Sequence, residues 1–282
     1  MKKSISIWSF RPEWDWDYNF RLARESGFDG IEIDISKEGA LPLNFQDAHV
    51  KAARALAKKH QLELSGLASL LYWEANGASD RPETRTAATD LVKQQIHAAA
   101  ALGIDTILMI PGSAGVDFIP DCEEIPYDVA MERARALIVG ALPLAEEKNV
   151  TLAIENVWNK LFLSPVELRD FVDSFQSAHV GVYLDVGNVL LNGYPEHWIK
   201  ILGHRIRRVH FKDFKRSIGN ANGFCDLLAG DVNWREVMQA LRGIPYDGWI
   251  AAEMIPPWPF YRQGTEVLIP NTSRAMDRIF AM

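Results

Sequence analysis

Residues 151–156 read TLAIEN, an apolar run that ends in a carboxylate and an amide, and this stretch decides the fold because its design recurs. It returns in three further runs, VGVYLDV at 180–186, RRVHF at 207–211 and WIAAEM at 249–254. Successive side chains of a strand point to opposite faces, so Glu155 takes one face while Leu152 and Ile154 take the other. We call this alternation of faces strand parity. It places one ionisable residue near the end of each run on the same face of the sheet: Glu155, Asp185, His210 and Glu253.

Four more short, β-rich runs precede these, at 4–8, 30–35, 62–68 and 106–110. Segments with helical apolar periodicity lie between the runs, and the clearest are 46–59, 84–102, 129–148, 165–175 and 232–242. Gly27, Gly103 and Asn149 each stand just before a strand, where a helix C-cap is expected. Eight strands in 282 residues give about 35 residues per strand–helix unit, the size of a βαβ repeat.

The alternation of strands and helices predicts an α/β protein with a parallel sheet, either open and doubly wound or closed into a barrel. The count of eight and the chain length favour a single (β/α)8 TIM barrel over residues 1–282, because no linker or low-complexity segment divides the chain. No dinucleotide-binding fingerprint or Walker loop follows any strand. The glycine-containing segment PGSAG at 111–115 fits a flexible loop better than a phosphate cradle.

Composition and charge restrict the function classes. The chain has 30 Lys and Arg against 37 Asp and Glu, a net charge of −7, which argues against a nucleic-acid partner. Cys122 and Cys225 are isolated, so neither a disulfide framework nor a cysteine-based zinc site is expected. No signal peptide or membrane span is recognisable, so we expect a cytoplasmic protein without a membrane partner.

In a parallel barrel, the carboxyl ends of the strands meet at one mouth, where catalytic sites form. Three carboxylates that converge there repel one another unless a cation compensates them. Glu155, Asp185 and Glu253 with the imidazole of His210 form an oxygen-rich set that suits a divalent metal ion, Mn²⁺ first, then Mg²⁺ or Co²⁺, with Zn²⁺ as a further candidate. Any one of these residues alone fits a salt bridge or cap, but four in matching register favour the metal.

Five segments together resemble one known family: AIENVWNKLFLSP at 153–165, YLDVGN at 183–188, RVHFKDF at 208–214, GDVNW at 230–234 and YDGWIAAEM at 246–254. They look like the sugar phosphate isomerase/epimerase group of xylose-isomerase-like TIM barrels, most like L-xylulose- and L-ribulose-5-phosphate 3-epimerases, with ketose 3-epimerases as near relatives. The resemblance implies that Glu155, Asp185, His210 and Glu253 are the metal ligands and that Glu155 and Glu253 are also the catalytic carboxylates.

The segment after the metal aspartate departs from part of that family. Free-ketose 3-epimerases typically carry a substrate-contacting histidine three residues after this aspartate, and here the position is Asn188. The departure favours a phosphorylated substrate, and a pentulose 5-phosphate in particular.

The expected reaction is inversion at C3 of a ketose or ketose phosphate. A metal ion that binds the keto oxygen and the 3-hydroxyl stabilises a cis-enediolate, one carboxylate removes the C3 proton, and the other returns a proton to the opposite face.

An aldose–ketose isomerase or a polyol-ketone dehydratase remains an alternative on the same metal site. A DNA-repair endonuclease of this fold lacks support, because the strand ends carry one histidine and the net charge is −7. A non-catalytic sugar-binding protein would not need two carboxylates beside a metal. The sequence leaves the assembly open, with a homodimer or homotetramer as the candidates.

Several other residues are candidates for contact with the sugar or sugar phosphate. Lys212 shares the parity of His210 and fits either a substrate contact or an ion pair with Asp213 or Glu253. Arg216 is a phosphate candidate or part of a solvated basic turn, and Glu32 fits a substrate hydroxyl or a nearby cation equally well. Tryptophans at or after strand ends are expected to line the pocket, with Trp158 the strongest candidate: Trp8, Trp14, Trp16, Trp73, Trp158 and Trp258.

Overall fold

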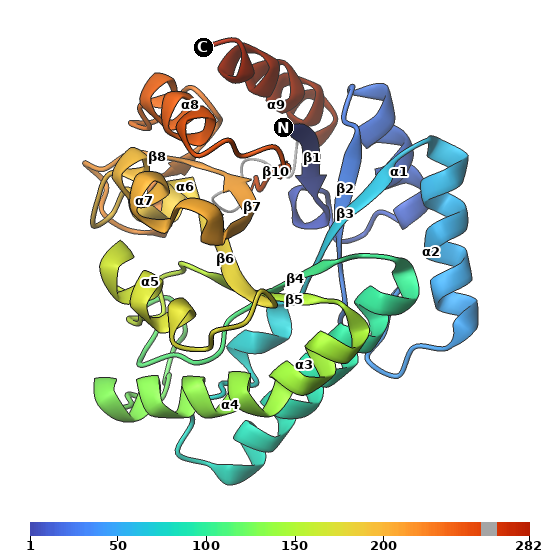
Figure 1. Cartoon of the computed structure of the whole chain (residues 1–282). Coiled ribbons are helices and arrows are strands. Elements are labelled where there is room, and N and C mark those ends of the chain that lie inside the picture. Colours follow the sequence, from blue (N-terminus) through green and yellow to red (C-terminus); the bar gives the residue numbers. More distant parts are fainter. Residues whose placement is uncertain (255–263) are drawn as a thin grey trace.

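Eight parallel strands close into a barrel in the computed structural model, which describes residues 1–254 and 264–282 (Figure 1). In the order around the barrel, β1 lies between β2 and β10, so the first and last strands close the cylinder. The barrel strands are β1 (Lys2–Ser6), β2 (Gly30–Asp34), β3 (Glu63–Ala68), β4 (Thr106–Met109), β5 (Thr151–Glu155), β6 (Val180–Asp185), β7 (Ile206–Phe211) and β10 (Trp249–Ala252). The predicted eight-stranded barrel is therefore confirmed.

Helices surround the barrel and cover the outer faces of its strands (Figure 1). They are α1 (Trp16–Glu25), α2 (Asp47–His60), α3 (Pro82–Leu102), α4 (Tyr127–Lys148), α5 (Pro165–Asp173), α6 (Val186–Val189), α7 (Pro195–Leu202), α8 (Trp234–Gly243) and α9 (Thr265–Phe280). The three residues that were predicted at the C-terminal ends of helices adopt positive φ, at 89° for Gly27, 80° for Gly103 and 53° for Asn149. This left-handed conformation ends a helix and turns the chain toward the next strand.

Six of the eight barrel strands end one or two residues earlier than the sequence pattern predicts, whereas β3 and β7 end at the predicted residue. β1 ends at Ser6, whose side chain accepts a hydrogen bond from the amide of Trp8, and a short 3₁₀ turn, Ile7–Ser9, follows. β10 ends at Ala252, although the amide of Glu253 still donates to the carbonyl of Phe211 at 3.1 Å. The polar residues that were predicted to end strands thus lie at or just past the last ladder bonds, where side chains can turn toward the barrel mouth.

A small antiparallel pair, β8 (Asp213–Phe214) and β9 (Phe224–Cys225), follows β7 and was not predicted. The fully buried carboxylate of Asp213 organises the segment after it. It accepts backbone hydrogen bonds at 2.9–3.2 Å from four amides, those of Phe214, Leu228, Gly230 and Val232. The indole Nε1 of Trp234 donates a further bond at 3.1 Å. This segment brings Phe224 to the mouth of the barrel.

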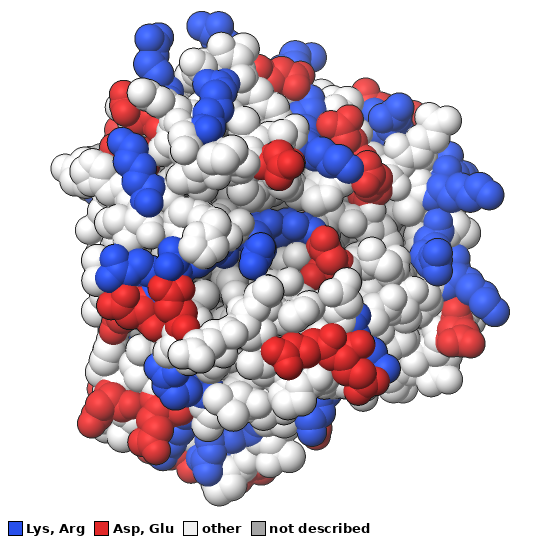
Figure 2. All heavy atoms as spheres, viewed as in Figure 1, with Lys and Arg blue, Asp and Glu red and all other residues white. Residues whose placement is uncertain are grey.

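The face of the molecule in Figure 2 shows Lys and Arg side chains interspersed with Asp and Glu, without a broad area of one sign. This distribution does not resemble the basic surface that binds nucleic acid. Within residues 1–254 and 264–282, no helix is both long and apolar enough to cross a bilayer. Cys122 and Cys225 are both free thiols, as expected from their isolation in the sequence.

Candidate metal centre and substrate cavity

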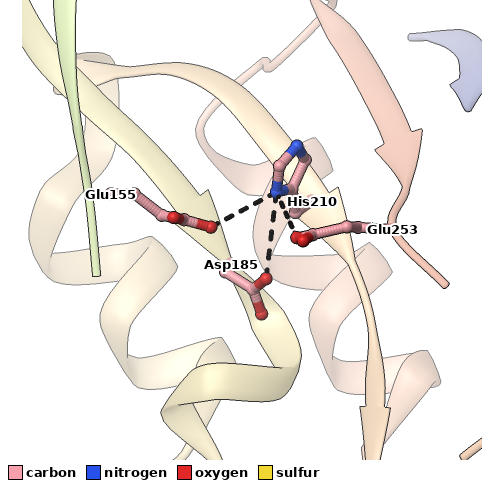
Figure 3. Close-up of side chains that lie close together, drawn as sticks. All are labelled: Glu155, Asp185, His210 and Glu253. Atoms are coloured by element: carbon pink, nitrogen blue, oxygen red, sulfur yellow. Dashed lines mark hydrogen bonds and ion pairs between the residues drawn. The ribbon is translucent and has the colours of Figure 1, made fainter. Parts of the chain in front are cut away.

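Four buried side chains gather at the carboxyl ends of neighbouring strands (Figure 3). Glu155 ends β5, Asp185 ends β6, His210 lies in β7, and Glu253 follows β10 directly. One potential ligand atom from each lies within 4.8 Å of the others. The structure therefore brings together the set that strand parity placed on one face.

The Nδ1 atom of His210 is the meeting point of the three carboxylates, as the dashed lines in Figure 3 show. It lies 2.8 Å from Glu253 Oε2, 3.3 Å from Glu155 Oε1 and 3.9 Å from Asp185 Oδ2. All four side chains are at most 6% exposed. Bulk water consequently gives these charges little screening, and their balance must come from neighbouring groups.

The opposite edge of the imidazole faces Glu32, which lies on β2 across the barrel. His210 Nε2 is 3.0 Å from Glu32 Oε1 and 3.1 Å from Glu32 Oε2, and the hydroxyl of Tyr183 donates to the same carboxylate. Glu32 is fully buried behind the histidine and is not among the residues that line the cavity described below. Of the two alternatives for Glu32, pairing with a cationic group is the one that fits. A carboxylate behind a histidine fixes the ring and leaves the other nitrogen for a metal.

Lys212 lies two residues after His210 and on the same side of the chain. Its Nζ is 2.9 Å from Asp185 Oδ2 and 2.9 Å from Glu253 Oε2, and it lies 5.0 Å from the centre of the Phe224 ring. The ion pair with Glu253 is therefore present. The alternative pair with Asp213 is wrong, because that carboxylate is occupied by backbone amides and an indole.

Asp185 is held in place by two asparagines. Asn156 Oδ1 accepts from the Asp185 amide at 2.8 Å, and Asn156 Nδ2 donates to the Asp185 carbonyl at 2.9 Å. The amide of Asn188 donates to Asp185 Oδ1 at 2.7 Å, so Asp185 also caps α6. Asn156 was not predicted as a site residue, although its place directly after the strand-ending Glu155 was a usable signal.

The buried charges shift one another strongly. Burial raises the pKa of Glu155 to about 7, since the hydrogen bond from His210 offsets the loss of hydration only in part. Burial also opposes ionisation of Glu253, but the nearby charges of Lys212 and His210 outweigh it and lower the pKa of Glu253 to about 2. Although burial disfavours the charged imidazole, Glu32 and Glu253 raise the pKa of His210 well above its usual value.

This donor set fits a divalent cation. Asp185 Oδ2 and Glu253 Oε2 are buried and make no hydrogen bond of normal geometry, despite their ion pairs with Lys212, so both retain lone pairs for a ligand. When all four carboxylates of this region ionise, including Glu32, their negative charge exceeds the positive charge of Lys212 and a protonated His210 by two. A bound divalent ion would reduce that excess and take the place of the proton at Nδ1.

A cavity of about 380 Å³ opens beside the centre. Glu155, Glu253 and Lys212 form part of its wall. Aromatic side chains make up much of the rest: Trp8, Trp73, Phe118, Trp158 and Phe224. A concave, largely apolar space next to a few convergent polar groups is typical of a small-molecule site.

Of the predicted substrate contacts, Asn188, Lys212, Trp158 and Trp8 all lie in the cavity wall. Trp158 donates its indole hydrogen to the Asn188 carbonyl at 3.0 Å and stacks on Phe224 with ring centres 4.9 Å apart. Two aromatic residues of the cavity wall, Phe118 and Phe224, were not predicted. Phe118 stands in a turn and Phe224 in the two-residue strand β9, and neither segment has strand or helix periodicity.

Besides Glu32, four of the residues that were expected to contact substrate or line the pocket are not among the described residues of the cavity wall. The exposed Arg216 donates to the Gly193 carbonyl at 3.1 Å and places its guanidinium over Tyr194, away from the cavity wall. Trp14 packs on Tyr18 and Trp16 on Phe20, and neither tryptophan lines the cavity. Trp258 lies outside the described residues.

Comparison with known proteins places the chain in a family. The model of the xylose isomerase-like TIM barrel family matches residues 20–270, so the chain belongs to that family. A D-psicose 3-epimerase of Enterocloster bolteae is 25% identical over 300 residues, covering 99% of this chain and 92% of that protein.

Solved structures show the same fold. A D-psicose 3-epimerase with D-tagatose from Clostridium cellulolyticum H10 has a TM-score of 0.78 at 20% identity, covering 99% of this chain and 98% of that one. The IOLI protein with a bound zinc atom has a TM-score of 0.81 at 17% identity, covering 100% of this chain and 98% of that one. At these identities the likeness establishes the fold and leaves the substrate to be argued from the cavity.

Proposed function

We propose that this chain is a divalent-metal-dependent sugar epimerase that inverts C3 of a ketose. The observation that carries the proposal is the placement of two carboxylates, Glu155 and Glu253, which both line the cavity and both contact the same nitrogen of His210. The 25% identity to a D-psicose 3-epimerase over nearly the whole chain supports the same reaction.

Glu155, Asp185, His210 and Glu253 would hold the metal ion, with Mn²⁺ as the proposed ion and Mg²⁺, Co²⁺ or Zn²⁺ as alternatives. A divalent ion supplies Lewis acidity, which makes hydrogen on a carbon next to a carbonyl easier to remove. The zinc atom in the IOLI protein shows that a barrel of this shape accepts such an ion.

The two carboxylates are the proposed acid and base. Glu155 on β5 and Glu253 after β10 stand at the two ends of the four-strand arc β5–β6–β7–β10, so they can reach a bound sugar from different sides. One removes the C3 proton and the other delivers a proton to the opposite face, which inverts the centre. Lys212 bridges Asp185 and Glu253 and is placed to hold the Glu253 carboxylate in its charged form.

Deuterium incorporation tests the proposal directly. Protein loaded with Mn²⁺ is incubated in D₂O with D-fructose, D-psicose and ketopentoses, with and without phosphate, and the products are analysed by NMR. We expect deuterium at C3 together with the inverted C3 configuration. Label at C1 or C2 without change at C3 would instead establish an aldose–ketose isomerase, and elimination of water would establish a dehydratase.

Two variants assign the roles. Glu155→Gln and Glu253→Gln should each lower the exchange rate by at least about 100-fold, since each removes a proton-transferring group. Glu63→Gln is the matched control, because Glu63 is an exposed glutamate on β3 that pairs with Lys2. If Glu253→Gln keeps full exchange with metal bound, the acid–base assignment is wrong.

A further inference from the structure

The cavity has one polar end and one apolar wall. Glu155, Glu253 and Lys212 form the polar end beside the metal centre. Away from them, the wall consists largely of aromatic and aliphatic side chains: Trp8, Leu70, Trp73, Leu108, Ile110, Phe118, Val157 and Phe224. A sugar bound with its reacting carbon at the polar end would extend its far end along this wall.

Part of the apolar wall is open to solvent. Leu70 is 49% exposed and Phe118 is 48% exposed, and both line the cavity. Phe118 meets Trp73 edge to face, with ring centres 5.2 Å apart. When a ligand covers large apolar side chains that face a cavity, the burial of apolar surface favours binding. An aromatic pair offers such a surface to an apolar group.

Two of the polar side chains along this wall already have hydrogen-bond partners within the protein. The uncharged polar residues in the described part of the wall are Ser69, Asn188 and Asn222. The Ser69 hydroxyl donates to the Ile35 carbonyl at 2.8 Å and accepts from the Leu71 amide at 3.2 Å. Asn188 uses its Nδ2 on the Asn156 carbonyl at 3.1 Å. A hydroxyl that loses water here without a new partner weakens binding.

The described wall also lacks a free cation. Lys212 is the one cationic side chain among the described residues that line the cavity, and its ammonium is paired with Asp185 and Glu253. Arg216, the phosphate candidate from the sequence, lies against Tyr194 outside the cavity. A phosphate dianion at the far end of the sugar would meet aromatic rings in place of charge-assisted hydrogen bonds.

We propose that the outer part of the cavity is a binding subsite for an apolar substituent, so that the substrate is a keto sugar carrying an aromatic or comparably bulky apolar group on the end away from the reacting carbon. This inference rests on the proposed function for the position of the reacting carbon. The group on that end of the sugar would thus be uncharged, in place of the phosphate expected from the sequence, and Trp73, Phe118 and Leu70 would cover it.

Three compounds that differ at a single oxygen test the subsite: D-fructose, 6-O-benzyl-D-fructose and D-fructose 6-phosphate. Binding to the Mn²⁺-loaded protein is measured by isothermal titration calorimetry and by tryptophan fluorescence, independently of turnover. We expect the benzyl ether to bind at least about tenfold more tightly than D-fructose, because the ring buries apolar surface against the aromatic pair. We expect the 6-phosphate to bind no more tightly than D-fructose.

Three variants locate the effect. Trp73→Ala and Phe118→Ala should each remove most of the benzyl preference, which is measured within each variant as the ratio of its affinities for the benzyl ether and for D-fructose. Trp14→Ala is the matched control, since Trp14 is also half-buried and also paired with an aromatic ring, Tyr18, but lies outside the cavity wall. It should keep the full preference.

The outcomes separate this inference from the proposed reaction. Equal affinity for the benzyl ether and D-fructose, absence of binding by both, or tighter binding of the 6-phosphate would overturn the apolar subsite. A benzyl preference that survives in both Trp73→Ala and Phe118→Ala would also overturn it. If the preference is found but no C3 exchange occurs with any ketose, the subsite stands and the epimerase assignment falls.

Discussion

His210 has carboxylate partners on both edges of its ring, and these contacts determine which ring nitrogen is available to a metal ion. Its Nδ1 faces Glu155 and Glu253, while its Nε2 faces Glu32. A hydrogen on Nε2 donates to Glu32, which leaves the Nδ1 lone pair for a metal ion. Tyr183 in turn donates to Glu32 and holds that carboxylate in position.

We predict that Glu32→Gln weakens divalent-metal binding by about 10-fold to 100-fold, because the histidine loses the carboxylate that orients it and raises its basicity. The measurement is calorimetric titration of metal-free protein with Mn²⁺, together with the absorption spectrum of the Co²⁺ form. The spectrum should change because the imidazole is less firmly placed, a readout that does not depend on turnover.

Glu63→Gln serves as the control for this prediction, since Glu63 is an exposed glutamate on the neighbouring strand β3. Its metal affinity should equal that of the unaltered protein. An affinity of Glu32→Gln within twofold of the unaltered value, with an unchanged Co²⁺ spectrum, would show that the carboxylate behind His210 has no part in positioning it.

The residues of the centre were accessible to sequence reasoning because strand parity is a local rule. Glu155, Asp185 and His210 follow directly from counting along an alternating run, and the structure places them together. The position of Glu32 was not accessible in the same way. The strand that carries it was predicted, but whether an inward side chain meets substrate or meets His210 depends on the depth of that side chain in the barrel, which the run on β2 does not encode.

At the scale of elements, strand β9 contributes Phe224 to the cavity and the turn after β4 contributes Phe118, and neither residue was predicted there. Alternation and helical periodicity identified the barrel strands and the long helices, because those elements each bury one face. The β8–β9 pair has only two residues per strand, too few to produce a period. Its conformation comes from one buried carboxylate and its backbone donors.

We predict that Asp213→Asn lowers the free energy of unfolding by about 3 kcal/mol, because an amide nitrogen then faces backbone and indole N–H groups that had a carboxylate oxygen as acceptor. Chemical denaturation measures the loss. Limited proteolysis should show faster cleavage within 215–231, because Leu228 and Gly230 no longer have the acceptor that fixes them.

Asp90→Asn is the matched control, since Asp90 is exposed on α3. It should unfold like the unaltered protein within about 0.5 kcal/mol. If Asp213→Asn is equally stable and equally resistant to protease, the buried carboxylate does not organise the β8–β9 segment.

At the scale of the whole molecule, β1 pairs with β10, so the first and last strands of the barrel complete one sheet. Strand β5, which supplies Glu155, lies between β4 and β6 in the same closed sheet, so the metal centre is built on the barrel that β1 and β10 complete. We propose that residues 1–282 form one domain on this ground, since removal of any barrel strand would open the sheet that carries the ligands.

We predict a single cooperative unfolding transition that a saturating divalent metal shifts upward. Far-UV circular dichroism and tryptophan fluorescence should coincide, and Mn²⁺ at 100 times its dissociation constant should add about 2.7 kcal/mol of stability. A chelator should reverse the shift, and a double variant, Asp185→Asn with Glu253→Gln, should show little response. Two separated transitions would contradict the single domain, and an equal metal response in the double variant would contradict the assigned ligands.

The closure of the barrel by its first and last strands also has a consequence for how the chain can be rearranged. Lys3 on β1 forms an ion pair at 2.5 Å with Asp277 near the end of α9, so the two ends of the described fold lie close together. A short flexible linker could therefore join residue 282 to residue 1, and new ends could be cut in an exposed loop far from the metal centre. Such a circular permutant should retain metal affinity, since strand neighbours around a barrel do not depend on where the polypeptide starts.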